Sequence, residues 1–201
     1  NSGSIQSGDV QWMTAGSGII HGEMPRDTWE RLCGIQLWVN LPKENKMMTP
    51  RYRDVKAEDI PTTEPSEGVK VKVIAGRSDE AVGPVKDLMV EVEYLDVSMN
   101  AGARFRHAIP RGLNAFAYMI QGEANFGGNK ARRQELVVFG DGDEISARSG
   151  EKGARFILAA GRPIGESVAW RGPIVMNSEA ELRDAFNEIR EGTFVRSKPL
   201  R

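Results

Sequence analysis

The sequence has few of the features that would tie it to an oxidising compartment, a membrane or nucleic acid. Its single cysteine, Cys33, excludes an internal disulfide framework and fits a reducing compartment, so we expect the cytoplasm, the nucleus or both. No apolar run approaches the roughly 20 residues that span a bilayer, and no signal peptide is recognisable. With 27 Lys and Arg against 28 Asp and Glu, the chain has no general electrostatic attraction to nucleic acid or an anionic membrane.

Two local features have simple structural interpretations. The basic group Lys130, Arg132 and Arg133 is typical of a solvated hairpin tip. Cys33 has no histidine nearby in the sequence, so we interpret it as a packed residue and not as a nucleophile.

Glycine is frequent, at 22 residues, and it separates short apolar runs. Short runs between Gly, Asn and Asp turns are typical of an all-β sandwich or barrel. The runs that we expect to be strands are Gly34–Leu41, Val69–Ile74, Leu88–Val97, Ala115–Ile120, Glu135–Phe139 and Arg155–Ala160.

The segment from Asp54 to Gly68 predicts an exposed linker. It contains Pro61 and Pro65 among several acidic residues, a composition typical of connections. We therefore expect a domain boundary there.

One helix is predicted near the end of the chain. Ser178 and Glu181 form a capping box, and Gly192 supplies a stop. Between them, Leu182, Ala185, Phe186 and Ile189 make one apolar stripe, and Arg190 lies in the last turn. We interpret this helix as structural.

A weak internal repeat divides the chain. Gly8-Asp9 is followed by Ala15-x-Ser17-Gly18, and Gly140-Asp141 is followed at the same spacing by Ala147-x-Ser149-Gly150. If each copy belongs to one barrel, about five strand-sized runs precede the second copy, whereas only residues 1–7 precede the first. We therefore expect the first barrel to lack its opening strands in this sequence, since a half barrel would expose unpaired edges.

His21 and Glu23 are the residues that most clearly indicate a chemical function. On a strand, residues i and i+2 face the same side, so the imidazole and carboxylate would converge. Such a pair is half of a site for non-haem Fe(II) or another divalent metal, or it is a buried histidine bonded to a nearby glutamate. The aligned positions of the second repeat, Gly153 and Arg155, are not metal ligands, so the second barrel is predicted to be metal-free.

The remaining candidates have structural interpretations. His107, beside Arg104 and Arg106, has no evident partner and is expected to be structural or at the surface. Trp12, Trp38 and Phe116 are expected in the core or lining a barrel, and Trp12 and Met13 are also candidates for contacting a ligand.

Four segments are distinctive: GDVQWMTAGSGIIHGEMP at 8–25, GIQLWVNLP at 34–42, NAFAY at 114–118 with Gly122-Glu123, and GPIVMN at 172–177. Together they resemble the pirin family of the cupin superfamily, and the resemblance covers nearly the whole chain. The resemblance implies a bicupin: two β-barrel or jelly-roll cupin domains, the first incomplete here, with a C-terminal α-helix. The expected divisions are 1–60 for the rest of the first, metal-holding barrel, 61–68 for a linker, 69–176 for the second barrel without metal, and 177–192 for the helix.

The resemblance also implies a metal site. The family holds Fe(II) with a His-x-His pair and a His-x-Glu pair, and His21 and Glu23 match the second pair. The first pair has no match in this chain, so only two of four expected ligands are present and tight metal binding by this chain alone is not expected.

Three functions follow from the resemblance. The first is that of a flavonol (quercetin) 2,3-dioxygenase, with Glu23 as the base that takes the flavonol hydroxyl proton. The second is that of a nuclear transcriptional co-regulator whose iron tunes binding to a transcription-factor protein, with Arg26, Asp27, Glu30 and Arg31 as a charged face. The third is that of a non-catalytic remnant with a vestigial site. The expected partner is thus a flavonol-like small molecule or a protein, and not nucleic acid or a membrane.

Overall fold

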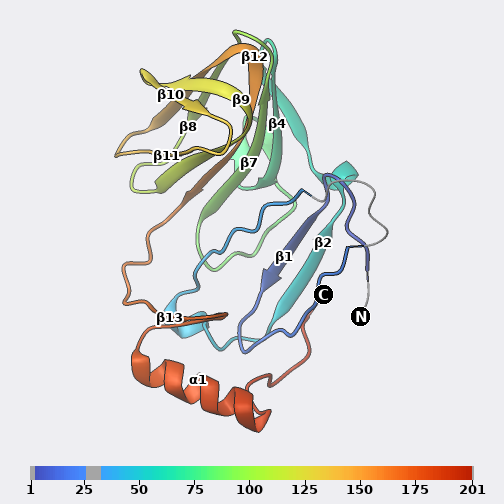
Figure 1. The fold of residues 1–201 in the computed structure, drawn as a ribbon, viewed down its shortest axis with the longest axis vertical. Coiled ribbons are helices and arrows are strands. Elements are labelled where there is room, and N and C mark those ends of the chain that lie inside the picture. Colours follow the sequence, from blue (N-terminus) through green and yellow to red (C-terminus); the bar gives the residue numbers. More distant parts are fainter. Residues whose placement is uncertain (1–2, 26–32, 201) are drawn as a thin grey trace. The chain divides into compact units, whose positions relative to one another are not determined.

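The computed structural model describes residues 3–25 and 33–200 (Figure 1). The chain divides into two compact units, each made from two separate stretches of sequence. The first unit comprises Asn1–Trp12 and Asp54–Pro163, and the second comprises Met13–Arg53 and Ile164–Arg201. The boundary falls within strands β1 (Val10–Thr14) and β2 (Arg51–Val55), which pair with each other.

The first unit is built around one eight-stranded sheet that curls into a barrel-like sandwich (Figure 1). Its main path runs β10-β9-β12-β7-β4-β3, with β11 paired to β9 and β8 paired to β12. The strands are β3 (Thr62–Ser66), β4 (Val69–Ala75), β7 (Val92–Met99), β8 (Arg104–Ala108), β9 (Asn114–Phe126), β10 (Asn129–Arg132), β11 (Leu136–Val138) and β12 (Glu144–Gly161). The unit also contains a small hairpin of β5 (Arg77–Ser78) and β6 (Ala81–Val82) and a 3-10 turn, η2 (Ala57–Asp59).

Alternating side chains form the main core of this unit. Along β7, Leu95, Val97 and Met99 are buried on one face, and the intervening residues are only half-buried. This period of two is what a sheet with one apolar face requires. Phe156 of β12 is fully buried and meets the rings of Phe105 and Phe126 edge-on, with centroids 5.8 and 5.3 Å away. The predicted all-β class is therefore confirmed for this unit.

Five of the six expected strand runs are confirmed in position. The runs at 69–74, 115–120 and 155–160 lie within β4, β9 and β12. The run at 135–139 contains β11, and that at 88–97 overlaps β7 from Val92 onward.

The predicted linker is wrong as a description of the secondary structure. Val55 and Ile60 are buried in a small core with Ile74, Ala75 and Val85. Thr62–Ser66 then forms β3, which pairs antiparallel with β4. The prolines of this segment mislead because an edge strand such as β3 leaves some N–H groups unpaired, which is where a sheet tolerates proline.

The second unit contains the expected helix, α1 (Glu179–Glu191). The Ser178 hydroxyl accepts the Glu181 N–H at 3.2 Å, and Gly192 ends the helix with a left-handed φ of 73°. Glu181 reaches back to the N–H of Asn177, one residue before the position that a capping box predicts. Leu182 and Ala185 are buried, whereas Ile189 is 42% exposed.

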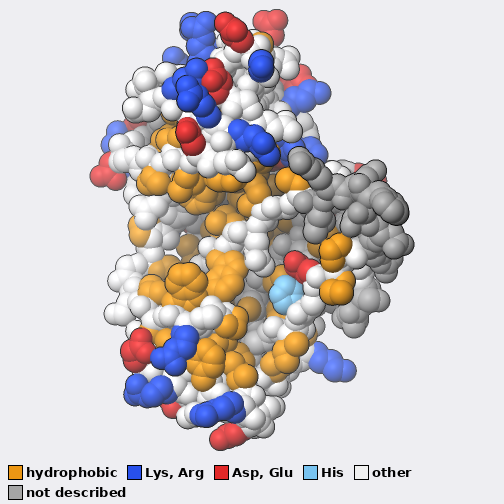
Figure 2. Space-filling view, viewed as in Figure 1, with side chains coloured by type: hydrophobic (Ala, Val, Ile, Leu, Met, Phe, Trp, Pro, Cys, Tyr) orange, Lys and Arg blue, Asp and Glu red, His pale blue; other side chains and the backbone are white. Residues whose placement is uncertain are grey.

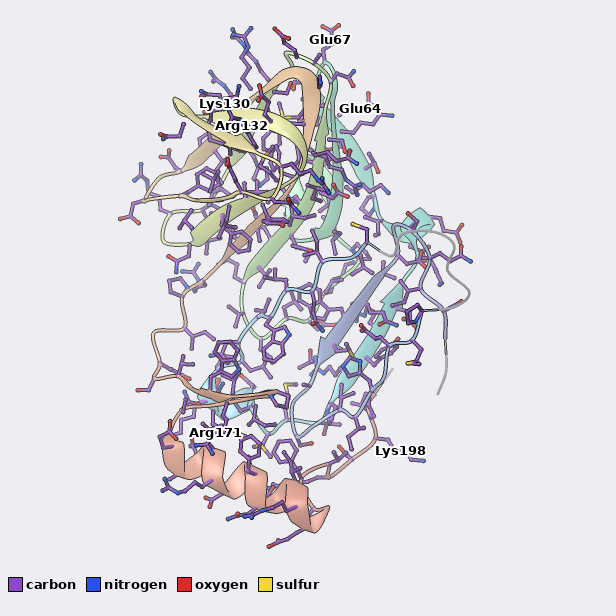
Figure 3. The ribbon with its side chains drawn as sticks, viewed as in Figure 1. Glu64, Glu67, Lys130, Arg132, Arg171 and Lys198 are labelled. Carbon is purple, nitrogen blue, oxygen red and sulfur yellow. The ribbon has the colours of Figure 1, made fainter. Side chains whose placement is uncertain are left out.

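The helix shares a small core with a short hairpin. The hairpin pairs β13 (Ala169–Arg171) with β14 (Ile174–Met176), and Ala169 and Met176 pack with Leu182, Ala185 and Phe194. The guanidinium of Arg171 lies 5.7 Å from the centroid of the Phe186 ring. Arg171 is labelled next to α1 in Figure 3. A 3-10 turn, η1 (Lys43–Asn45), precedes β2.

The expected strand Gly34–Leu41 is wrong, because these residues are neither helix nor strand. Trp38, expected in the core, is 55% exposed, and Ile35 and Val39 are also exposed. A strand forms only against a hydrogen-bonded neighbour, and no described strand pairs with this segment. Apolar side chains of this segment therefore lie at the surface. Figure 2 shows that hydrophobic side chains gather in patches on the face turned to the viewer.

The basic group on the first unit lies where the sequence predicts. Lys130 and Arg132 belong to β10, and both extend into solvent beside the β9–β10 turn (Figure 3). The Lys130 ammonium lies 2.6 Å from the Glu123 carboxylate. In the part of the chain that the structure describes, no helix has the length and apolarity needed to cross a membrane.

Candidate functional site

His21 and Glu23 lie side by side in the second unit. His21 Nδ1 is 3.8 Å from Glu23 Oε1, and the two side chains are 42% and 60% exposed. The strand expected here is absent, since residues 18–25 are neither helix nor strand. The interpretation as a buried histidine is also wrong, because both groups are open to solvent.

The chain that leads to His21 is closely fixed by its small residues. Ser17 N–H donates to the Met48 carbonyl at 2.9 Å. Gly16 has a φ of 49°, and a Cβ there would lie 2.1 Å from that same oxygen. At Gly18, a Cβ would lie 2.9 Å from the Phe194 ring. The Gly-Ser-Gly sequence therefore allows this segment to pack against Met48 and Phe194. This packing fixes the position of the backbone a few residues before His21.

An open groove of about 490 Å³ adjoins this segment. It is lined by Gly18, Ile19, Ile20 and residues 195–199. Ile20 is 90% exposed, so the groove has an apolar edge next to His21 in the sequence. Arg196 and Lys198 contribute positive charge, although Arg196 is paired with Glu188 at 3.0 Å. A groove of this size and character could hold a small aromatic anion.

The donor atoms of the pair suit a divalent metal such as Fe(II), which favours imidazole with carboxylate. The described residues contain no group of three or more His, Cys, Asp or Glu side chains that could hold a metal ion. His21 and Glu23 therefore fit half of a metal centre, and the part of the chain described here does not complete it.

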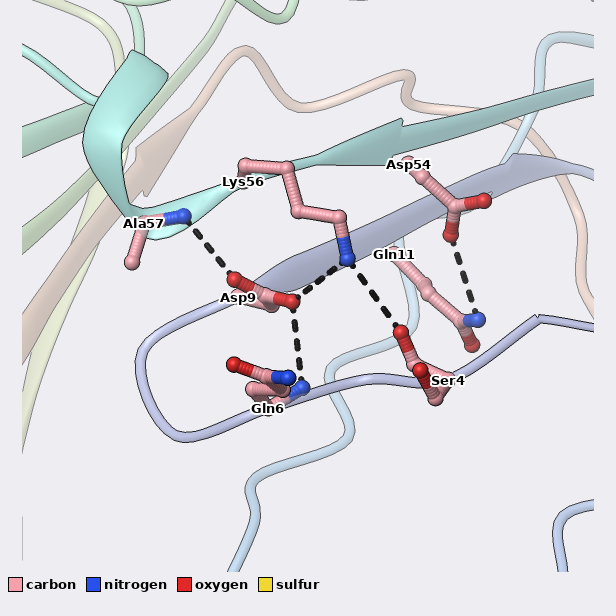
Figure 4. Close-up of polar contacts among 7 residues, drawn as sticks. All are labelled: Ser4, Gln6, Asp9, Gln11, Asp54, Lys56 and Ala57. Carbon is pink, nitrogen blue, oxygen red and sulfur yellow. Dashed lines mark hydrogen bonds and ion pairs between the residues drawn. The ribbon is translucent and has the colours of Figure 1, made fainter.

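A turn in the first unit positions the start of β1 (Figure 4). The Asp9 carboxylate accepts the Ala57 N–H at 2.9 Å and the Gln6 N–H at 3.0 Å, and Lys56 Nζ lies 2.8 Å from it. The Lys56 hydrogen bond is the main cause of a lowered pKa for Asp9, about 2. Lys56 also donates to the Ser4 carbonyl at 3.2 Å. Since both carboxylate oxygens of Asp9 accept hydrogen bonds from neighbouring parts of the chain, we interpret Asp9 as a structural residue.

A polar cluster in the second unit joins residues 40–46 to the C-terminal stretch. Lys46, only 7% exposed, donates to Asn40 Oδ1 at 2.7 Å and to the Leu41 carbonyl at 3.0 Å. Burial lowers the pKa of Lys46, and the charges of Glu166 and Glu181 oppose that shift. Glu166 in turn accepts the Lys43 N–H at 2.8 Å. The cluster is a hydrogen-bonded attachment between distant stretches of sequence.

The first unit contains a second histidine–glutamate pair that the sequence did not reveal. His107 Nε2 lies 2.8 Å from Glu93 Oε2, and the side chains are 9% and 13% exposed. His107 therefore has a partner that the sequence did not show, and its nearly buried side chain fits the structural interpretation and not the surface one. One feature of the sequence could have revealed this pair. Glu93 alternates with Leu95, Val97 and Met99, so on a strand it shares their face and points toward the core.

Of the other residues singled out in the sequence, some lie where they were predicted and others do not. Trp12 packs at the edge of the small core around Val55, as expected. Phe116 is half-buried, on the face of β9 opposite to the buried Ala115 and Ala117. Cys33, expected to be packed, is exposed, because the segment that it begins has no regular structure. The charged residues proposed as a partner face, Arg26, Asp27, Glu30 and Arg31, lie outside the described residues.

Two known family models match this chain. The family model described as pirin matches residues 1–39, and that described as the pirin C-terminal cupin domain matches residues 94–195. Pirin-1 of Arabidopsis thaliana is 43% identical over 94% of this chain and 66% of its own length. A Pseudomonas aeruginosa protein named as a candidate quercetin 2,3-dioxygenase is 40% identical over 96% of this chain and 70% of its own.

A solved structure shows the same fold. The crystal structure of quercetin 2,3-dioxygenase from Acinetobacter baumannii matches with a TM-score of 0.81 and 27% identity, over 94% of this chain and 68% of that one. The architecture is therefore a cupin β-sandwich with one C-terminal helix. The chain spans about two thirds of the length of these relatives.

Proposed function

The chain belongs to the pirin family, and from this we propose that the intact protein is an Fe(II)-dependent dioxygenase of the quercetin (flavonol) type. The observation that carries the proposal is the close approach of His21 and Glu23, which directly follow in the sequence the groove residue Ile20. The names of the Pseudomonas and Acinetobacter relatives support the choice of substrate class.

In this proposal, His21 and Glu23 are two of four metal ligands, and the other two are a His-x-His pair outside this chain. The bound metal would supply Lewis-acid polarisation of the flavonol oxygens. The Glu23 carboxylate takes the proton of the flavonol hydroxyl. The exposed Ile20 provides an apolar contact for the aromatic rings, and Lys198 favours the anion that results from the proton transfer.

The test compares iron content and oxygen uptake in one series of samples. The intact protein, with any residues that precede Asn1, and the 201-residue chain are loaded with Fe(II) without oxygen and analysed for iron. Oxygen uptake is then followed with quercetin. We expect about one iron in the intact protein, and a loss of at least tenfold in both iron affinity and uptake in His21→Ala and Glu23→Gln.

Glu64→Gln is the matched control, because Glu64 is an exposed carboxylate in the other unit, with a side chain that is 66% exposed. It should leave iron content and uptake unchanged. If the intact protein binds iron but quercetin elicits no oxygen uptake, the substrate class is wrong. If neither His21→Ala nor Glu23→Gln changes the iron content, these residues are not ligands.

Two alternatives stay predictions. No described residue favours iron-dependent binding of a transcription-factor protein over catalysis. A vestigial site would bind no iron in the intact protein, so the same iron measurement addresses it.

A further inference from the structure

A second pocket lies in the first unit, at the place where β9 and β12 stop pairing regularly. Its volume of about 200 Å³ is roughly that of six or seven water molecules, at about 30 Å³ each. The register of the two strands shifts between Ser149 and Ala154 and again between Arg155 and Phe156. Irregularities of this kind are frequent beside functional sites, because they turn side chains out of the regular ladder.

Two glycines allow three stretches of backbone to meet at this pocket. Gly122 of β9 has a φ of 67°, and a Cβ there would lie 2.1 Å from the Gly153 carbonyl oxygen. Gly153 of β12 has a φ of 74°, and a Cβ there would lie 2.5 Å from the Met99 carbonyl oxygen. Any larger residue at either position would collide with main chain. Part of the pocket wall is therefore backbone, whose position the sheet fixes.

The side chains around the pocket carry hydrogen-bonding groups of several kinds. They are Ser98 of β7, Asn100 just after it, Gln121 of β9, and Lys152 and Arg155 of β12. Asn100, Gln121 and Lys152 are exposed, so solutes can reach them. Ser98 and Gln121 lie opposite Arg155 on its two neighbouring strands, so the three side chains share one face of the sheet. Hydroxyl, amide, ammonium and guanidinium donors thus border one small space.

The charge of the pocket is positive. Among the described residues that line it, Lys152 and Arg155 are cationic and none is acidic. Asp96 accepts two hydrogen bonds from the Arg155 guanidinium, at 2.9 and 2.6 Å, which offsets one charge and holds the guanidinium in place. Glu123, next to the pocket in the sequence, is paired with Lys130 at 2.6 Å. The exposed Lys152 therefore gives the pocket its net positive charge.

We propose that this pocket binds a small phosphate, either inorganic phosphate or a phosphate monoester. A phosphate group carries more than one negative charge near neutral pH, and its oxygens accept hydrogen bonds from several directions. A carboxylate has only two oxygens, which lie in one plane. Lys152 supplies the main attraction, Arg155 a fixed guanidinium, and Asn100 and Gln121 amide donors. The site lies in a different unit from the proposed metal centre and does not depend on it.

The experiment titrates the ¹⁵N-labelled 201-residue chain with inorganic phosphate, glycerol 2-phosphate or acetate, at constant ionic strength. Amide chemical shifts show where each anion binds. We expect saturable shifts at Gly122, Gly153 and Ala154 with both phosphates, and much weaker binding of acetate. The phosphate with the lower dissociation constant identifies the source, free phosphate or an organic monoester.

Two substitutions at exposed positions test the assignment. Lys152→Gln should raise the dissociation constant for phosphate roughly fivefold, because it removes the main positive charge of the pocket. Gln121→Glu should raise it further, since it adds a carboxylate beside the ligand. Lys86→Gln is the matched control, because Lys86 is an exposed lysine of the same unit outside the pocket, and this variant should bind as the parent does.

Three outcomes overturn the proposal. They are shifts that do not saturate, a dissociation constant that is the same in Lys152→Gln and Lys86→Gln, and acetate binding as tight as that of phosphate. None of these measurements involves iron or oxygen, so this proposal can fail while the dioxygenase proposal stands.

Discussion

Each of the two histidines of this chain lies beside a glutamate, but in very different surroundings. His21 and Glu23 are 3.8 Å apart, about half exposed, and lie in a segment without regular structure. His107 and Glu93 are 2.8 Å apart, nearly buried, and come from two strands of one barrel. The first pair is made by proximity in the sequence, and the second exists only because the sheet has folded. Similar chemistry is thus placed in one case where it is accessible and in the other where it is costly to disturb.

The largest contrast should appear when an apolar side chain is removed from each environment. Phe156→Ala should lower the free energy of unfolding by about 3–5 kcal/mol, because it leaves a cavity between Phe105 and Phe126. Ile20→Ala should change it by less than about 0.5 kcal/mol, since Ile20 is 90% exposed. Urea unfolding followed by circular dichroism measures both. Equal effects would mean that the second unit is as tightly packed around Ile20 as the barrel is around Phe156.

Removing one partner from each pair comes next. Glu93→Ala should destabilise the first unit by about 1–3 kcal/mol, because His107 loses its acceptor inside the barrel. Glu23→Ala should lower the free energy of unfolding by less than about 0.5 kcal/mol, as expected for an exposed pair. Urea unfolding curves recorded near neutral pH measure both changes. A small cost for Glu93→Ala would contradict the structural difference between the pairs.

The helix of the second unit should respond to a local change. Ser178→Ala should cost about 1 kcal/mol, because the Glu181 N–H loses its capping acceptor. Ser178→Asp retains an acceptor and is the matched control, expected to lie within a few tenths of a kcal/mol of the parent. The free energy of unfolding of each variant is measured from the ellipticity at 222 nm during unfolding. A loss that is equal in the two variants would mean that the cap does not stabilise the helix.

The smallest expected effect is at Asp9, and it depends on pH. The pKa of Asp9 is lowered from 3.8 to about 2 by Lys56 and two backbone N–H groups, so its ionised form stabilises the fold. This contribution is complete above about pH 4 and is lost as the pH falls toward 2. Asp9→Asn should therefore be less stable than the parent near neutral pH, and the difference should shrink in acid. Unfolding curves at several pH values test this, and a difference that is independent of pH would contradict it.

Local patterns predicted much of the fold. The helix could be placed because each of its ends has a local signal: Ser178 and Glu181 act within the first turn, and Gly192 acts at the last. Strands β4, β9 and β12 could be placed because alternation and Gly-rich turns are also local signals. The convergence of His21 and Glu23 belongs to the same class, since two residues so close in the chain cannot lie far apart.

The sequence by itself thus determined the all-β class, the capped helix, the family and the first histidine–glutamate pair. Tertiary structure alone decided that Thr62–Ser66 is an edge strand and that Gly34–Leu41 is not a strand, because a strand depends on a partner supplied by another part of the chain. It also decided that His107 meets Glu93, two residues on different strands. The physical reason is the same in each case: local signals fix backbone conformation and facing, whereas pairing and burial depend on which distant segments the folded chain brings together.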